Sequence, residues 1–316
     1  MAVGTTSTFS QNRNQIINRA MAAIGIRTDQ RALTASEVSE ASDELNIMLK
    51  SWKTKDYLWK TEEGTLFLVN GQASYKLDGL VANATQNYSA TTTTANAASA
   101  ATSIPVTSTS GFVIGYFIGI VQDNNTILWT TISNIVGTTI SLASPLTYAA
   151  ASGNNVYCYQ TKINRPEIIN SLRIRTSTGT DTPTTALARD SYFNIPVKTN
   201  SARPNQWYYD KQLSFGTIYL WPTPNSVSDT VNFTFQKMFL DIDSAATDPD
   251  FPIEWIDPIV LNLALRLARI KGKDKEFREQ LRRDAEQALA DVQGYDREPA
   301  SIYFQPATSV NIGSYR

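Results

Sequence analysis

The fold is decided by the stretch Asp250-Phe-Pro-Ile-Glu-Trp-Ile-Asp-Pro-Ile-Val-Leu-Asn-Leu-Ala-Leu-Arg-Leu-Ala-Arg269, the most apolar run of the sequence that is compatible with a helix. Pro252 suits a first helical turn, where its missing N–H is not needed. Pro258 predicts either a kink or the first helical residue, with Asp257 as the N-cap. From Ile259 onward, apolar residues fall on almost every side of the helix. A helix of this kind is buried among other elements.

Two amphipathic helices are predicted near the N-terminus, joined as a helical hairpin. The first runs from Gln11 to Ile24, with Ser10 as its N-cap and Gly25 at its end. The second begins with the capping-box pattern Thr34-Ala-Ser-Glu37 and continues through residue 53 with apolar residues at helical spacing.

A last amphipathic helix is predicted from Lys273 to Val292, after Gly272 has ended the apolar run. Only this helix and the N-terminal pair are available to bury the apolar helix. The two ends of the chain should therefore meet in one helical core, and β structure should lie between them.

The pattern changes to β structure at Thr65. Thr65–Val69 and Ser74–Leu77 flank Asn70-Gly71, which predicts a β-hairpin. One face of the strand at 230–238 should be buried, because its apolar residues alternate with polar ones. Further strands are expected at 168–175, 191–195, 206–209, 212–215 and 217–221.

A compositional change marks an insertion. Sixteen of the twenty residues in 84–103 are Ala, Ser or Thr, which predicts a linker or a loosely held loop. Closely spaced short strands follow and indicate a small β-barrel or sandwich. They are expected at 103–107, 116–122, 127–132, 138–142 and 156–160.

The predicted fold class is α+β: a discontinuous helical bundle formed by both chain ends carries an antiparallel β domain with a small inserted barrel or sandwich. The predicted boundaries are 8–60 for the helical hairpin, 61–85 and 161–249 for the β domain, 86–160 for the insertion, 250–293 for the C-terminal helices and 294–316 for an extended tail.

Composition excludes several kinds of active site. The 316 residues contain no histidine and have a net charge of −1. Histidine-based nucleophilic sites and metal sites are therefore absent, and we expect no cofactor or metal. The single cysteine, Cys158, cannot form an intramolecular disulfide and is predicted to be a buried packing residue. No transmembrane run, signal peptide or phosphate-binding glycine loop is recognised, so no membrane association is expected.

Two surfaces remain as candidates for binding. The first is basic, because residues 266–283 hold eight Lys or Arg and three Asp or Glu. It is either a solvated helix face or a surface that meets DNA or an acidic partner. Its residues singled out for that role are Lys271, Lys273, Lys275, Arg278, Arg282 and Arg283.

The second candidate surface is the C-terminal tail, which lacks periodicity but keeps apolar and aromatic residues. Such a segment is typical of one that becomes ordered by docking on another chain. The alternative is a tail packed on its own helical domain. The expected anchors are Tyr295, Ile302, Tyr303, Phe304, Ile312 and Tyr315.

The order of several motifs resembles that of the head-to-tail adaptor proteins, also called connector or tail accessory proteins, of tailed and especially short-tailed bacteriophages. The inserted region at 86–160 departs from the smaller members of that family. The motifs are Ile17–Gly25, Leu45–Trp52, Phe67–Tyr75, Pro204–Tyr209 with Ile218–Pro224, and Phe251–Trp255 with Leu261–Ala268.

The resemblance implies a structural virion protein at the head-tail junction, assembled in the host bacterial cytoplasm. Such proteins form a ring of about twelve copies below the portal protein. The ring extends the channel for double-stranded DNA, which passes non-specifically, and offers a platform for tail or nozzle proteins. No catalysis is required. Two alternatives remain: a carboxylate-based cell-wall or polysaccharide hydrolase, and a carbohydrate-binding adhesion module based on Trp207-Tyr-Tyr and Trp221.

Overall fold

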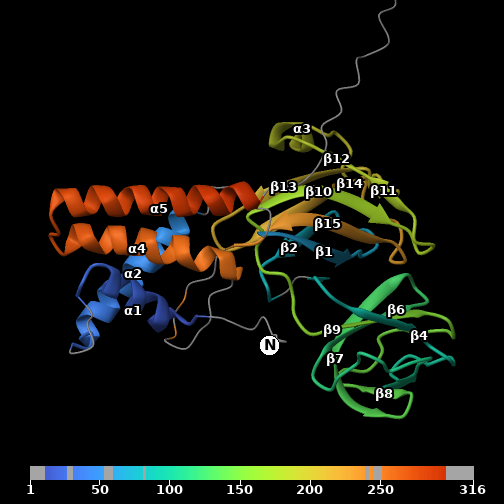
Figure 1. Ribbon diagram of the computed structural model, residues 1–316. Coiled ribbons are helices and arrows are strands. Elements are labelled where there is room, and N and C mark those ends of the chain that lie inside the picture. The colour runs from blue at the N-terminus through green and yellow to red at the C-terminus, as the bar shows by residue number, and fades with distance from the viewer. Residues whose placement is uncertain are drawn as a thin grey trace, which may run out of the picture. The chain divides into compact units, whose positions relative to one another are not determined.

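A computed structural model describes residues 11–26, 31–52, 60–80, 83–238, 242, 244 and 251–296. The chain divides into two compact units (Figure 1). One contains Met1–Trp59 and Phe239–Arg316, and the other contains Lys60–Met238. Helices and antiparallel sheets are both present, which confirms the α+β class.

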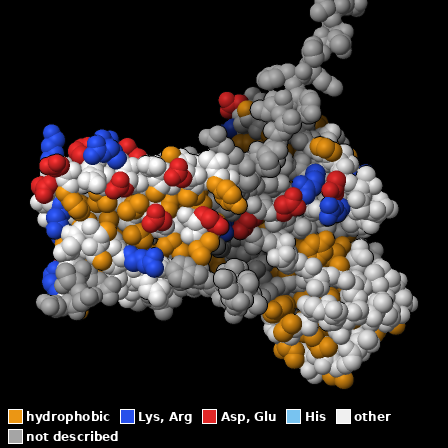
Figure 2. Space-filling model, viewed as in Figure 1, with side chains coloured by type: hydrophobic (Ala, Val, Ile, Leu, Met, Phe, Trp, Pro, Cys, Tyr) orange, Lys and Arg blue, Asp and Glu red, His pale blue; other side chains and the backbone are white. Residues whose placement is uncertain are grey.

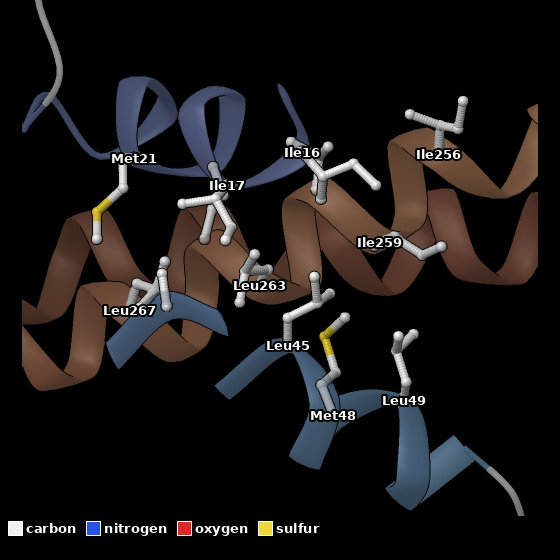
Figure 3. Close-up of a cluster of buried hydrophobic side chains, with 14 of the residues drawn as sticks. Ile16, Ile17, Met21, Leu45, Met48, Leu49, Ile256, Ile259, Leu263 and Leu267 are labelled. Atoms are coloured by element: carbon white, nitrogen blue, oxygen red, sulfur yellow. The ribbon is translucent and has the colours of Figure 1, made fainter. Parts of the chain in front are cut away.

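The first unit is helical. Its helices are α1 (Arg13–Ala23), α2 (Ala35–Trp52), α4 (Ile256–Ile270) and α5 (Lys275–Tyr295), and a 3₁₀ turn, η2 (Ile253–Trp255), leads into α4. Residues from all four helices share one hydrophobic core. Leu263 of α4 is completely buried and lies between Ile17 of α1 and Leu45 of α2 (Figure 3). The apolar run is therefore the buried helix that its sequence predicted.

The start of α1 differs from the prediction. Its N-cap is Asn12, whose side chain accepts a hydrogen bond from the Gln15 backbone N–H at 3.0 Å. The Gln15 side chain in turn accepts one from the Asn12 backbone N–H at 3.0 Å, which completes a capping box. Gly25 ends the helix with a φ of +68°, as predicted.

Pro258 occupies neither of its two predicted positions. It is the third residue of α4, and Trp255 rather than Asp257 is the N-cap. As the third residue of α4, Pro258 falls within its first turn. Backbone N–H groups of a first turn have no partner inside the helix, so the proline costs no hydrogen bond there.

The predicted capping box of α2 is confirmed. The Thr34 hydroxyl accepts from the Glu37 backbone N–H at 3.3 Å, and the Glu37 carboxylate accepts from the Thr34 backbone N–H at 2.9 Å. That backbone hydrogen bond, together with Arg31, lowers the pKa of Glu37 to about 2.

A lowered pKa predicts a pH-dependent contribution of Glu37 to stability. The contribution is complete above the ordinary carboxyl pKa of about 4.5 and is lost as the pH falls towards about 2. We expect the difference in unfolding temperature between the wild type and Glu37→Ala to be constant above pH 5. It should then narrow between pH 4.5 and pH 2. A difference that stays constant down to pH 2 would contradict this assignment.

The second unit contains a two-layer β sandwich. One sheet has the order β11 (Asp181–Pro183), β10 (Ile168–Arg175), β15 (Thr230–Gln236), β1 (Thr61–Phe67) and β3 (Ala84–Thr85). The other has the order β12 (Thr185–Ala186), β13 (Gln206–Lys211), β14 (Gly216–Trp221) and β2 (Ser74–Leu77). All neighbours are antiparallel except β12 and β13. Side chains from both sheets fill one core.

The predicted hairpin at Asn70-Gly71 is wrong. β1 pairs with β15 and β3, whereas β2 pairs with β14 in the other sheet. The turn itself exists, because the Gln72 N–H donates to the Val69 carbonyl at 3.1 Å and Gly71 has a φ of +77°. The segment between β1 and β2 spans the distance between the two layers, so this turn connects one sheet to the other.

Three other β predictions are corrected. The strand expected at 191–195 is wrong, because residues 191–193 belong to the short helix α3 (Arg189–Phe193), which buries Tyr192 and has Asn194 as its C-cap. Residues 212–215 form the turn between β13 and β14 instead of a strand. Both faces of β15 are largely buried, because Asn232 and Gln236 are as inaccessible as the apolar residues between them. β15 lies between β10 and β1 in its sheet.

The inserted region forms a third sheet. Its order is β4 (Ser89–Thr92), β9 (Asn155–Tyr159), β6 (Phe117–Gln122), β7 (Thr126–Val136), β8 (Thr139–Leu142) and β5 (Ser103–Pro105). The sheet curls around its own apolar core, and a bridge between Thr93 and Val106 brings its two edges together.

The Ala/Ser/Thr stretch is not the loose loop that its composition predicted. It supplies β4 and a series of backbone hydrogen bonds, including Thr107 N–H to Thr92 at 2.9 Å and Ala97 N–H to Ala150 at 2.8 Å. Ala97 and Ala150 are buried in the core of this sheet. The two alanines pair with each other across an isolated β-bridge.

Gly64 is required by close packing inside the sandwich. A β-carbon at this position would lie 2.5 Å from Ile163 Cδ1 and 2.8 Å from Phe233 Cζ. Both neighbours are buried and have little room to move. Gly64→Ala should therefore lower the free energy of unfolding by about 1–3 kcal/mol, as overpacking does.

Denaturant unfolding of the purified variant tests this expectation. Gly294→Ala is the matched control, since nothing lies within 4 Å of its β-carbon and alanine favours the helix. Equal stability of the Gly64 variant and the wild type would show that the sandwich can relax.

Candidate assembly surfaces

The turn between α4 and α5 positions most of the predicted basic residues. Gly272 adopts a φ of +66°, and the Lys273 N–H donates to the Ala268 carbonyl at 3.0 Å. These are the features of a Schellman C-cap. Asp274 then caps α5 by accepting from the Phe277 N–H at 2.9 Å. The two caps fix a short connection whose side chains are held at one end of the helix pair.

Part of the predicted positive charge is neutralised inside the helical unit. Lys271 pairs with Glu40 of α2, and Arg266 lies 3.6 Å from Glu44 of the same helix. Arg282 pairs within α5, at 2.9 Å from Glu279 and 3.2 Å from Glu286. The pairs with Glu40 and Glu44 were not visible in the local sequence, because α2 is more than two hundred residues away.

The remaining basic residues are available to a partner. Lys273, Lys275 and Arg283 form no ion pair with any residue that the structure describes. Within the part of the chain that the structure describes, the Arg278 side chain donates to the backbone carbonyl of Asp274, at 3.3 Å, and to no carboxylate. The structure thus brings Lys273, Lys275 and Arg278 together at the turn and places Arg283 further along α5.

The docking tail lies almost wholly outside the described residues. Tyr295 is the exception: it is the last residue of α5 and is 82% exposed. The helix therefore continues three residues beyond its predicted end and includes Tyr295, which was expected in an extended segment. Ile302, Tyr303, Phe304, Ile312 and Tyr315 stay predictions from the sequence.

The aromatic residues considered for sugar binding are largely occupied by packing. Trp207 is buried in the sandwich core. The Tyr209 hydroxyl donates to the Pro166 carbonyl at 2.7 Å. Tyr208 stacks on Tyr219, with ring centres 5.9 Å apart. These contacts favour the alternative that the aromatic residues fill a sheet face.

An aromatic cluster missed by the sequence reasoning joins the inserted sheet to the sandwich. Phe67 of β1 lies 4.6 Å from Tyr157 and 6.0 Å from Tyr159, measured between ring centres, and 5.1 Å from Trp129. The alternation in Val-Tyr-Cys-Tyr could have revealed it. Cys158 faces the core of the inserted sheet, whereas both tyrosines face the cluster.

A second connection lies at the β6–β7 turn. The Asn125 side chain donates to the Asn225 carbonyl at 3.0 Å and accepts from the Val227 N–H at 3.3 Å. The inserted sheet is therefore fixed to the sandwich at two places, by apolar packing and by hydrogen bonds.

Among the described residues, no group of three or more potential metal ligands occurs. Burial raises the pKa of the Cys158 thiol to about 11, so the thiol is protonated at neutral pH and is a packing residue as predicted. Nor does the described part of the chain contain a helix with the length and apolarity needed to cross a membrane.

Residues 144–308 match the model of a family described as SU10 adaptor protein. The match covers more than half of the chain, and the protein belongs to this family. It is therefore a bacteriophage adaptor-type protein, as the resemblance predicted. No curated protein matches the sequence.

The matched region contains β9 of the inserted sheet, the sandwich strands β10 to β15, α4, α5 and part of the tail sequence. Helices α1 and α2, the sandwich strands β1, β2 and β3, and most of the inserted sheet lie outside it.

Proposed function

We propose that this protein is a structural virion component at the junction between the DNA-filled head and the tail. Copies form a ring, about twelve in number, below the portal protein. The ring extends the channel through which double-stranded DNA passes, and it provides the platform on which tail or nozzle proteins assemble. The match of residues 144–308 to an adaptor family carries this proposal.

Three features of the structure support the same role. Helices α1, α2, α4 and α5 share one core, which agrees with a discontinuous bundle formed by both ends of the chain. The inserted sheet is held rigidly enough to serve as an attachment surface, because it is fixed by the Phe67 cluster and by Asn125. Lys273, Lys275 and Arg283 have no ion pair among the described residues, which leaves them free to meet DNA or a partner.

The channel should not read the DNA sequence. Base-specific contacts would stall a moving duplex, whereas phosphate contacts by lysine and arginine are independent of sequence. Any binding of duplex DNA by the assembled ring should therefore weaken steeply with salt and be equal for unrelated sequences.

The test of the proposed function is to mix the purified full-length protein with the portal ring of the same phage. Negative-stain images and mass photometry should show a ring of adaptor copies on one face of the portal. A protein that remains monomeric and does not bind the portal would overturn the proposal. Clearing of bacterial cell walls by that monomer would instead support the hydrolase alternative.

A further inference from the structure

A groove between α4 and α5 carries negative charge around an apolar floor. It has a volume of about 380 Å³, and Leu261, Ala288 and Val292 contribute to its floor. Carboxylates surround this floor from both helices: Glu254, Asp257, Asp284 and Asp291. Figure 2 shows hydrophobic side chains gathered over α4 and α5, with acidic side chains along the same face.

These four carboxylates are not used within the part of the chain that the structure describes. All four are exposed, and none of them forms an ion pair or hydrogen bond there. Leu261 and Val292 pack on the helical core but stay only partly buried. α4 is therefore apolar on more sides than a single copy covers, and the uncovered side is ringed by unpaired negative charge.

The other end of the same helix pair has the complementary character. Lys273 and Lys275 are unpaired at the α4–α5 turn, and Arg269 is exposed beside them. Two large apolar side chains project among these basic residues: Ile270 is 43% exposed and Phe277 is 38% exposed. The turn therefore presents apolar side chains within positive charge, and the groove presents an apolar floor within negative charge.

We propose that the α4–α5 turn of one copy docks in the α4–α5 groove of the next copy. Phe277 and Ile270 would cover the floor around Leu261, and Lys273 and Lys275 would pair with the carboxylates. This inference rests on the proposed ring and names the surfaces by which its subunits meet.

The geometry fits a ring because the two surfaces are different and far apart on one copy. Lys275 and Asp291 are separated by about 24 Å along α5, at about 1.5 Å per helical residue. A contact between two different surfaces is heterologous, so each copy keeps one free surface of each kind. Further copies then add until the ring closes.

Charge decides between this occupant and the C-terminal tail. Residues 269–278 contain five basic and two acidic residues, whereas residues 297–316 contain two basic and one acidic residue. Four carboxylates favour the more basic segment, since complementary charge also speeds association and selects the register of docking.

Charge reversal provides the test, with full-length protein throughout. One variant, Asp284→Lys with Asp291→Lys, makes the groove basic; the other, Lys273→Glu with Lys275→Glu, makes the turn acidic. Each variant alone should associate at least about tenfold more weakly than the wild type, in sedimentation velocity and on the portal ring. An equal mixture should restore assembly, because each groove then meets a turn of opposite charge.

Restored rings should contain the two variants in alternation, which native mass spectrometry of differently tagged copies can show. The matched control is Glu279→Lys with Glu286→Lys. It makes the same charge change on exposed positions of α5 outside the groove and should assemble like the wild type. Circular dichroism confirms that each variant is folded.

The outcomes separate this inference from the proposed function. If the wild type forms rings and the groove and turn variants form them equally well, the proposed contact surfaces are wrong, but the proposed ring is not affected. If the tail proves to fill the groove, the proposed contact surfaces are likewise wrong and the ring is likewise not affected. Failure of the equal mixture of the two variants to assemble would also overturn the pairing of turn and groove. So would a wild-type assembly whose mass does not rise above that of a dimer. A wild type that neither self-associates nor binds the portal would overturn the proposed function itself.

Discussion

Replacing Leu263 by alanine should lower the free energy of unfolding of the helical unit by about 2–5 kcal/mol, the range seen for leucines in close-packed cores. The side chain is completely buried in α4, and α1 and α2 both pack on it through Ile17 and Leu45 (Figure 3). Removing it leaves a cavity lined by three helices, none of which can collapse without disturbing the other two. Guanidinium unfolding followed by helical circular dichroism measures the loss.

Leu213 provides the matched control for this experiment. It is 96% exposed in the turn between β13 and β14, so Leu213→Ala removes the same atoms without leaving a cavity. Its effect should stay within about 0.5 kcal/mol. A similar, small effect of both substitutions would mean that α4 is not held in a close-packed core.

The sequence predicted a helix or strand correctly where neighbouring residues alone determine that element. The strand predicted at 168–175 is β10, with the same bounds. The five strands expected in the insertion are all present, because short apolar runs alternate there with Asn- and Gly-containing turns that adopt positive φ at Asn125 and Gly137. The cap of α2 was predicted because its hydrogen bonds connect residues only three apart.

Predictions failed where the structure depends on distant parts of the chain. The turn at Asn70-Gly71 was found, but no local signal states that β1 pairs with β15, more than 160 residues away. Composition also misjudged the Ala/Ser/Thr stretch. Backbone hydrogen bonds hold it in the third sheet, and these are independent of side-chain hydrophobicity.

The same difference between local and long-range information applies to the candidate surfaces. The basic run was visible in the sequence, but its partial neutralisation by Glu40 and Glu44 depends on how α2 packs against α4. The acidic groove could have been found earlier. Asp284 and Asp291 are seven residues apart, and residues with this spacing lie on one face of a helix.

Deleting residues 299–316 should leave the protein folded and abolish its stable attachment to the portal ring. The described helices and sheets end before this segment, so helical circular dichroism and unfolding temperature should be unchanged. The lost residues include most of the predicted anchors, Ile302, Tyr303, Phe304, Ile312 and Tyr315. Ordering a docked segment costs about 1–2 kcal/mol per residue in backbone entropy, which several anchors must offset at about 1.5–3 kcal/mol each.

Because the entropy cost of ordering the tail and the gain from burying its anchors nearly balance, a single tail binds weakly, whereas the many tails of one ring bind tightly. Linked copies gain about 10²–10⁴ in avidity, so we expect portal binding to fall by at least about a hundredfold in a pull-down or by mass photometry. Substituting Ile302, Tyr303 and Phe304 by serine in the full-length chain should have a similar effect, because the segment keeps its length but loses its central anchors. Substituting Gln305 and Thr308 by serine is the control and should be neutral. Portal binding by the truncated protein at wild-type strength would show that the tail has no docking role and that attachment depends on the described units alone.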